Sequence, residues 1–193
     1  NINATYNNNE IKSLFTGIDE LSIGSSGNFT QSGASSPSVS NFAIVGQPAY
    51  VFKLTDYVRD PMGRVVVDRV TGNPQVDDSL VTRGRSLPLW LIGVNPSFNW
   101  KGLSIGMTWD YKGGHNAFTQ LGTDMDFTGT SERSTMYDRQ RFVFPNSVYW
   151  DGSKYVENND IQVQTGGKNF FTNASTNAGV GTNYFFSASS WKL

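Results

Sequence analysis

The chain has 193 residues, of which 37% are hydrophobic and only 16% charged, and its formal net charge at pH 7 is −1. Soluble domains usually carry more charge, about 25%, and a near-neutral balance offers no basic surface to nucleic acid. The absence of Cys excludes disulfides and thiolate metal sites. No apolar run reaches the length of about 18 residues that a transmembrane helix needs. The 20 Gly residues, together with abundant Asn, Ser and Thr, favour strands joined by polar loops.

The first part of the chain predicts short strands between irregular segments. Residues 1–7 alternate as a strand does, and residues 8–20 are compatible with a short helical turn. Residues 21–41 are rich in Gly, Ser and Asn and predict a loop. Residues 42–58 predict two short strands around a Gly/Pro break, and residues 71–74, Thr-Gly-Asn-Pro, predict a turn.

A hairpin in the middle of the chain has the clearest pattern. Residues 89–100 predict a strand that Pro96 interrupts, and Lys101-Gly102 predicts a tight turn into a second strand, residues 103–112. Successive side chains of a strand point to opposite faces, and ten residues suffice for a tilted strand to cross a bilayer. We expect one face to meet lipid and the other to line a wet lumen. The predicted lipid-facing residues are Leu103, Ile105, Met107, Trp109 and Tyr111, and the predicted lumen-facing residues are Ser104, Thr108, Asp110 and Lys112.

Beyond this hairpin, residues 113–183 predict a long loop region of about seventy residues. It contains a smaller hairpin, residues 142–149 and 154–156, turned at Asp151-Gly152. Such a long connection is rare in compact soluble domains, whereas outer-membrane barrels have short turns on one side and long loops on the other. The chain ends in a further strand pattern, and both ends suggest a segment of a longer protein.

No residue pattern indicates catalysis, a cofactor or a metal site. His115 is the single histidine and has no matching triad spacing. Asp124-Met125-Asp126 and Asp77-Asp78 lack the spacing of a calcium loop and are interpreted as solvated loop residues. Arg133, Arg139 and Arg141, with Asp138, are interpreted as loop ion pairs. Trp150, with its neighbour Tyr149, lies in a predicted loop turn, and this aromatic pair is the candidate contact with a ligand or partner.

Eight short stretches, in chain order, are similar to sequence phrases of one protein family. Val45-Gly46-Gln47-Pro48, which an aromatic run through Tyr57 follows, and Gly93-Val94-Asn95-Pro96-Ser97-Phe98 are two of them. The other six are Asn7–Leu14, Val66–Asp68 with Thr71–Pro74, Trp100–Ser104, Lys112–Gly114, Arg141–Val148 and Ser187–Leu193. The chain resembles a late barrel segment of the SusC/RagA-type, TonB-dependent outer-membrane transporters of Bacteroidetes. It departs from the family at Asn146, where Gly is frequent, and at Trp100, where Tyr is frequent.

The resemblance implies an all-β fold in which residues 1–193 form antiparallel transmembrane strands and long extracellular loops of a 22-stranded barrel. The plug domain and the remaining strands are not in this sequence. The implied function is uptake of oligosaccharides or peptides across the Gram-negative outer membrane, without enzymatic activity or cofactors. The implied partners are outer-membrane lipid, a SusD-like surface lipoprotein that acts as a lid and, through the plug, the TonB-ExbB-ExbD complex. The resemblance makes Trp150 and Tyr149 the candidate contacts with cargo or this lid. The alternative is a soluble β-sandwich, such as a carbohydrate-binding or adhesin module.

Overall fold

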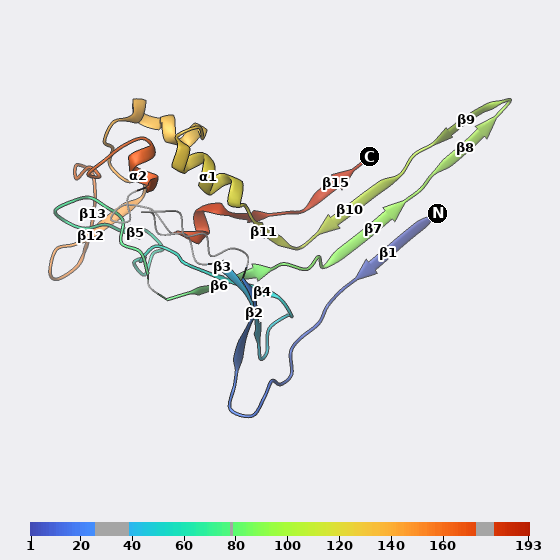
Figure 1. Ribbon diagram of the computed structural model, residues 1–193, viewed down its shortest axis with the longest axis horizontal. Coiled ribbons are helices and arrows are strands. Elements are labelled where there is room, and N and C mark those ends of the chain that lie inside the picture. The colour runs from blue at the N-terminus through green and yellow to red at the C-terminus, as the bar shows by residue number, and fades with distance from the viewer. Residues whose placement is uncertain (26–38, 78, 173–179) are drawn as a thin grey trace.

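The computed structural model describes residues 1–25, 39–77, 79–172 and 180–193. It consists of a folded lobe and a long arm of strands that projects from the lobe (Figure 1). Both chain ends lie along the arm, at the outer ends of its two flanking strands (Figure 1). The described part is mostly β, with antiparallel sheets that have open edges and do not close into a barrel. The predicted antiparallel β class is therefore confirmed, whereas the predicted barrel is not.

The arm is a four-stranded antiparallel sheet that a hairpin extends outward. The sheet has the order β1 (Ile2–Tyr6), β7 (Trp90–Val94), β10 (Trp109–Gly113) and β15 (Ser190–Lys192). Beyond it, β8 (Ser97–Trp100) pairs with β9 (Leu103–Gly106) up to the tip. Lys101 and Gly102 turn this hairpin with φ of 46° and 88°. Positive φ at both central residues suits the right-handed twist of paired strands, and the predicted hairpin is confirmed.

The predicted strand 103–112 is interrupted at Met107 and Thr108. These two residues follow β9 and lie beside Asn95-Pro96, which separates β7 from β8. Pro96 has no N–H to donate to a ladder, but its carbonyl still accepts a hydrogen bond of 3.1 Å from the Met107 N–H. The interruption is therefore local, and the two long strands of the arm stay side by side across it (Figure 1).

A second four-stranded antiparallel sheet joins the arm to the lobe. Its order is β2 (Glu20–Ser25), β3 (Val39–Ile44), β4 (Val51–Leu54) and β6 (Val81–Arg85). The loop predicted for residues 21–41 is wrong where β2 and β3 lie, and residues 26–38 are outside the described part. The short helical turn predicted within residues 8–20 is not helical: the segment has a single hydrogen-bonded turn, in which the Ile18 N–H donates to the Phe15 carbonyl at 3.0 Å, and no helix. The two strands predicted within residues 42–58 are confirmed by β3 and β4.

Within the predicted loop region 113–183, the described residues carry helices and strands and form most of the lobe. The segment leaves the arm through β11 (Asn116–Phe118) and returns through β14 (Phe185–Ser187), which pairs with β11. Between them lie α1 (Gln120–Thr128), η1 (Glu132–Arg139), α2 (Lys168–Thr172) and η2 (Gly181–Tyr184). Thr119 caps the start of α1, where its side chain accepts a hydrogen bond from the Gly122 N–H, and Gly129 ends it with φ of 77°. Both capping residues fall within the region that the sequence predicted as a loop.

The smaller predicted hairpin is confirmed with shifted limits. Its strands are β12 (Ser147–Trp150) and β13 (Tyr155–Glu157), and β12 also pairs in parallel with β5 (Val65–Val66). The Asp151 carboxylate accepts hydrogen bonds from the backbone N–H groups of Ser153 and Lys154, which closes the turn. A turn also lies close to the one predicted at residues 71–74, but a few residues earlier, since the Gly72 N–H donates to the Asp68 carbonyl at 2.9 Å.

Two small hydrophobic clusters hold the lobe and the joining sheet. Val39, Phe52 and Leu54 form one cluster, and Tyr57, Val65 and Val180 form the other. Phe118 and Phe185 from the paired strands β11 and β14 pack against the first cluster, which anchors the base of the arm. None of the described helices is both long and apolar enough to span a membrane.

Candidate functional site

The sheet of the arm has one continuous apolar face. Residues that lie directly opposite each other in antiparallel strands share a face. The strand register puts Ile2, Val94 and Trp109 in one row across the sheet, and Tyr6 and Trp90 in another. Between them runs a row of Ala4, Ile92, Tyr111 and Trp191. Tyr6 packs on Trp90 and Tyr111 on Trp191, each with ring centroids 4.5 Å apart.

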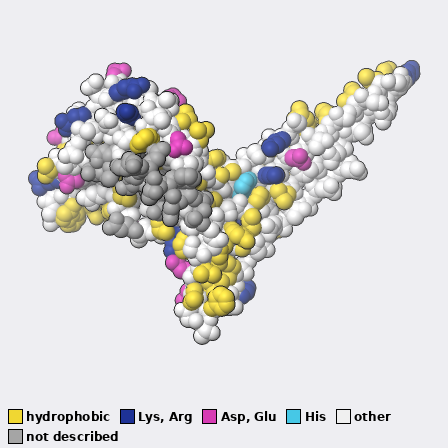
Figure 2. Space-filling model, in the orientation of Figure 1, with side chains coloured by type: hydrophobic (Ala, Val, Ile, Leu, Met, Phe, Trp, Pro, Cys, Tyr) yellow, Lys and Arg dark blue, Asp and Glu magenta, His cyan; other side chains and the backbone are white. Residues whose placement is uncertain are grey.

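The outer hairpin continues this pattern to the tip of the arm. Phe98 lies opposite Ile105, and Trp100 lies opposite Leu103, so the four side chains share one face of the β8–β9 ribbon. Ser97, Asn99, Ser104 and Gly106 occupy the other face. Hydrophobic side chains follow the arm out to its tip (Figure 2).

The apolar face of the arm is uncovered. Trp191 is 68% exposed, Trp100 59% and Trp109 43%, and every residue of β1, β8, β9 and β15 is exposed. Exposed apolar surface of this extent marks an interaction surface, because an ordinary protein surface carries its apolar residues in small patches. No other sheet packs on the arm among the described elements.

The opposite face of the sheet is polar. Asn3, Gly93, Asp110 and Lys192 form one row of it, and Thr5, Leu91, Lys112 and Ser190 form the next. Leu91 is the one large apolar residue in these two rows. Asp110 and Lys192, of opposite charge, lie directly opposite each other. The two faces therefore differ sharply in chemistry.

This geometry brings together most of the residues predicted from the sequence. Leu103 and Ile105 share a face in the hairpin, and Trp109 and Tyr111 share one in the sheet. Ser104 lies on the polar face of the hairpin, and Asp110 and Lys112 lie on that of the sheet. Met107 and Thr108 lie in the interruption between β9 and β10, so no strand pairing assigns either to a face. Contact with lipid or with a lumen stays a prediction for the whole set.

The prediction missed the neighbouring strands that complete the apolar face. Ile2, Ala4 and Tyr6 alternate in β1, and Trp90, Ile92 and Val94 alternate in β7. The same period of two was therefore present in the sequence. The lateral order β1-β7-β10-β15 could not be predicted, because β1 pairs with β7 and β10 with β15 across about 80–90 residues of chain.

Tyr149 and Trp150, the predicted cargo or lid contacts, lie in β12 of the lobe. Trp150 is exposed and packs edge-on against Tyr155 at 5.0 Å, while the Arg69 guanidinium lies 5.9 Å from the Tyr149 ring centroid. Both residues lie outside the aromatic cavity of the lobe, described below. Their contact with a ligand stays a prediction.

Asp126, interpreted from the sequence as solvated, and Arg133, interpreted as part of a loop ion pair, belong to one buried network. Asp126 is 1% exposed, and its carboxylate accepts hydrogen bonds from the Arg133 guanidinium, the Ser131 hydroxyl and the Tyr184 hydroxyl. The solvated interpretation of Asp126 and the exposed interpretation of Arg133 are therefore wrong. The network links α1, η1 and η2, and burial raises the pKa of the Tyr184 hydroxyl, as does its hydrogen bond to Asp126.

Asp56 organises a second buried network at the junction of the joining sheet and the lobe. Burial alone would raise the pKa of this carboxyl group. Hydrogen bonds from Arg59, Arg83, the Tyr57 N–H and Thr182 outweigh burial and lower the pKa below its ordinary value. Arg83 donates at 2.6 Å and Thr182 at 2.9 Å. The carboxylate therefore holds β6 and η2 together.

The remaining titratable candidates do not assemble into a catalytic or metal site. His115 contributes its carbonyl to a hydrogen bond of 3.0 Å from the Ala188 N–H, and its buried Nδ1 has no partner in the described part. Asp77 caps its own turn through Ser79, and Asp78 lies outside the described residues. No group of three or more His, Asp or Glu side chains suited to a metal occurs in residues 1–25, 39–77, 79–172 and 180–193.

Arg139 and Arg141 are not the ion pairs that the sequence suggested. Arg141 donates to the backbone carbonyl of Val163 at 2.7 Å. No ion pair joins Arg139 or Arg141 to Asp138 among the described residues. The Arg141 side chain therefore bonds to the lobe through backbone carbonyls.

Comparison with known proteins assigns no family to this geometry. The chain matches no protein-family model and no curated protein sequence.

Proposed function

We propose that this chain forms part of the wall and mouth of a TonB-dependent outer-membrane importer of the SusC/RagA type. In this proposal the arm supplies transmembrane strands, and the lobe lies on the extracellular side. The importer takes up oligosaccharides or peptides together with a SusD-like lipoprotein. The observation that carries the proposal is the uncovered apolar face of the arm, which lies back to back with a polar face.

A bilayer is the environment that suits such a sheet. In water, the half-exposed aromatic and aliphatic side chains of the arm would cost on the order of 10 kcal/mol, at 1.5–3 kcal/mol for each large side chain fully buried. A barrel wall removes this cost because one face meets lipid while the other meets a wet interior. The strands of the arm alternate in this way.

The length of the apolar face fits a bilayer. Aromatic rings lie at both ends of this face, with Phe98 and Trp100 near the tip and Tyr6 and Trp90 at the base; Tyr111 and Trp191 lie in the row next to the base, and Trp109 lies between the two ends. Trp90 and Trp100 are ten residues apart, which at 3.3 Å per residue is about 33 Å along the strand. A strand tilt of about 40° reduces this to about 25 Å, the height of the apolar band between the aromatic girdles of outer-membrane barrels.

The open edges of the arm support a barrel further. β1 and β15 each pair on one side only in the described structure. β1 carries no charged residue and no Pro, the features that normally protect an exposed edge. In a membrane both edges require a partner strand, because no water is present to satisfy their backbone groups.

The two ends of the arm differ as the ends of a barrel do. The tip is a two-residue turn, Lys101-Gly102, whereas the base leads into the folded lobe (Figure 1). Outer-membrane barrels have short periplasmic turns and large extracellular loops. The lobe is therefore assigned to the outside, where a lid lipoprotein and cargo would meet it. The resemblance assigns energy transduction to contacts between the plug and TonB-ExbB-ExbD.

One backbone detail agrees with the sequence resemblance. Asn146 stands where the family often has Gly, and its φ is 51°. Gly adopts this left-handed conformation most easily, and Asn adopts it more readily than most other residues. The departure from the family pattern therefore keeps the backbone conformation that Gly would allow.

Brominated lipids test the membrane assignment directly. Two variants each retain one Trp, either Trp109 on the arm or Trp150 on the lobe, with the others replaced by Phe. In vesicles with brominated acyl chains, the fluorescence of Trp109 should be strongly quenched, whereas that of Trp150 should change little. Equal quenching of the two, or a stable monomer that needs neither detergent nor lipid, would overturn the proposal and favour a soluble binding module.

A further inference from the structure

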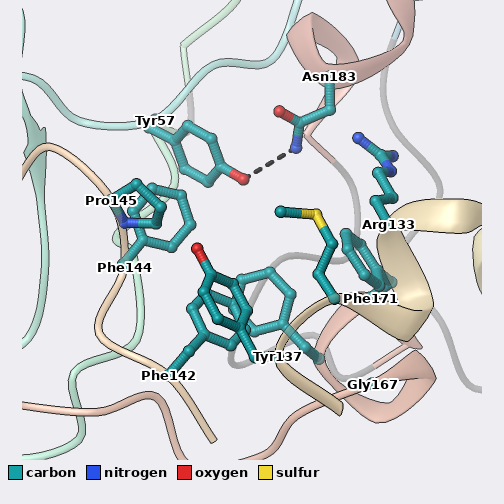
Figure 3. Close-up of a pocket in the computed structure, with 11 residues that line it drawn as sticks. Tyr57, Arg133, Tyr137, Phe142, Phe144, Pro145, Gly167, Phe171 and Asn183 are labelled. Carbon is teal, nitrogen blue, oxygen red and sulfur yellow. Dashed lines mark hydrogen bonds between the residues drawn. The ribbon is translucent and has the colours of Figure 1, made fainter. Parts of the chain in front are cut away.

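The lobe contains an aromatic cavity of about 160 Å³, which no residue of the arm strands lines (Figure 3). Rings from three separate parts of the chain line it, together with Met136. The aromatic residues of this lining include Tyr57, Tyr137, Phe142, Phe144 and Phe170. None of them belongs to the apolar face of the arm.

The rings hold one another in fixed orientations. Tyr137 stacks on Phe142, with centroids 4.6 Å apart and an interplanar angle of 14°. Phe170 meets Phe142 edge-on at 5.1 Å, and Tyr57 meets Phe144 edge-on at 5.5 Å. A ligand that enters this cavity therefore meets walls that are already ordered, which reduces the entropy that binding must overcome.

The rim beside Tyr137 is held in an uncommon backbone conformation. Tyr137, Asp138 and Arg139 have φ of 54°, 52° and 62°, a region that residues other than Gly seldom adopt. Two glycines brace this turn from the other side. A Cβ at Gly166 would lie 2.0 Å from the Gln140 carbonyl oxygen, and one at Gly167 would lie 3.0 Å from the Arg139 Cβ.

This strained turn positions a ring at the entrance of the cavity. Tyr137 is 46% exposed and Met136 is 50% exposed, yet both line the cavity. Strained backbone that its surroundings hold in place is frequent at ligand sites. The exposed edge of the stacked pair Tyr137–Phe142 is thus open to a ligand from solvent.

Two phenol hydroxyls supply the polarity at the centre. The Tyr57 hydroxyl accepts a hydrogen bond of 2.8 Å from the Asn183 side-chain amide, and both it and the Tyr137 hydroxyl point into the cavity (Figure 3). Burial raises the pKa of Tyr57 to about 12, so this hydroxyl keeps its proton at physiological pH and can donate it. The nearby Arg133 is already paired with Asp126 and is not available as an anion site.

The size and lining select the ligand. An engineered apolar cavity of about 150 Å³ in another protein binds benzene, so the present cavity accommodates one six-membered ring. A sugar ring would bury several hydroxyls against carbon walls, and each hydroxyl without a partner costs binding free energy. An aromatic ring with at most one polar substituent leaves no such group unsatisfied.

We propose that this cavity binds one aromatic side chain, Phe or Tyr, of a peptide ligand, with the Tyr57 hydroxyl donating a hydrogen bond to the peptide. As a statement about imported cargo, the proposal rests on the proposed function, since it selects peptides over oligosaccharides. As a statement about binding, it stands on the cavity alone.

Methionine methyl NMR of the full chain in detergent micelles provides the test. The chain has 4 Met residues, of which Met136 lines the cavity, whereas Met62 and Met107 lie elsewhere and act as internal controls. The probes are the N-acetyl amides of phenylalanine, tyrosine and alanine, together with maltose. We expect the phenylalanine and tyrosine amides to shift the Met136 methyl signal in a saturable way, while the alanine amide and maltose leave it unchanged.

Two variants test the wall and the donor separately. Tyr137→Ala removes the stacked ring and should weaken binding at least tenfold. Tyr57→Phe keeps the shape of the cavity and should weaken binding about fivefold, as loss of one hydrogen bond does. Phe15→Ala, an exposed aromatic outside the cavity, is the matched control and should bind normally.

The outcomes separate this proposal from the membrane assignment. No shift at Met136 with either aromatic amide, an equal shift with the alanine amide, or a shift with maltose would each overturn the aromatic site. None of these results changes the quenching of Trp109 by brominated lipid. Conversely, unquenched Trp109 with intact binding at Met136 would retain the site and reject the importer.

Discussion

Removal of the Asp126 carboxylate should destabilise the lobe more than any other single change in α1. In Asp126→Ala, Arg133 loses hydrogen bonds of 2.8 and 3.0 Å from its Nε, and Tyr184 loses one of 2.7 Å from its hydroxyl. Breaking a buried ion pair by removing one partner costs about 3–5 kcal/mol. The Arg133 side chain is 33% exposed and can partly rehydrate, so we expect a loss near the lower limit, about 3 kcal/mol.

Denaturant unfolding, combined with hydrogen exchange of the α1 amides, measures this loss. Asp124→Ala, on the same helix but with a less buried side chain, is the control and should change stability by at most about 0.5 kcal/mol. The double variant Asp126→Ala/Arg133→Met removes the unpaired charge and should recover part of the loss. The reasoning would be refuted if Asp126→Ala lost no more than Asp124→Ala, or if the double variant lost the sum of two large single effects.

Three further changes test other parts of the structure. The pKa of Asp56 is lowered in the folded chain, so the stability that its carboxylate contributes is present above the unfolded pKa of about 3.9 and is lost as pH falls below it. The difference in unfolding free energy between the wild type and Asp56→Asn should therefore shrink as pH falls from 7 to 3. A constant difference would contradict the pairing of this carboxylate. Val94→Arg, midway along the apolar face, should cost about 2–4 kcal/mol of folding free energy in lipid vesicles if this face meets the bilayer, whereas Asn3→Arg on the opposite face should cost little, and equal costs would argue against lipid contact. Gly166→Ala places a Cβ 2.0 Å from a backbone oxygen and should cost about 2–3 kcal/mol in thermal melts. Gly106→Ala, with nothing within 4 Å and no positive φ, should change stability by at most about 0.5 kcal/mol, and similar melting temperatures would contradict the close approach at Gly166.

The arm could be predicted from the sequence because its information is local. Alternation in residues 103–112 separates an apolar from a polar face, and Lys101-Gly102 marks the turn between two strands. Pro96 marked the interruption of the first strand, since it cannot donate to the ladder. The matching interruption at Met107 and Thr108 was missed, because it follows from what lies across the hairpin.

The lobe was predicted as a loop because its elements are short and weakly patterned. Helix α1 has 9 residues with its caps at Thr119 and Gly129, and both residue types also mark turns. Strands β2, β11 and β14 are stable only beside their partners, and β11 meets β14 across about 70 residues of chain. Local preference cannot select such elements, because isolated short helices and strands are marginal in water.

The sequence by itself determined the antiparallel β character, the central hairpin and the two chemically distinct faces of the arm, since period-two alternation and turn chemistry act between near neighbours. Only the tertiary structure decided the lateral order of the arm strands, the burial of Asp126 beside Arg133 and Tyr184, and the aromatic cavity. Tyr57, Phe142 and Phe170 lie far apart along the chain. They meet because burial of apolar surface is non-directional, so any packing that removes these rings from water is favourable. That long-range choice leaves no periodic trace in the sequence.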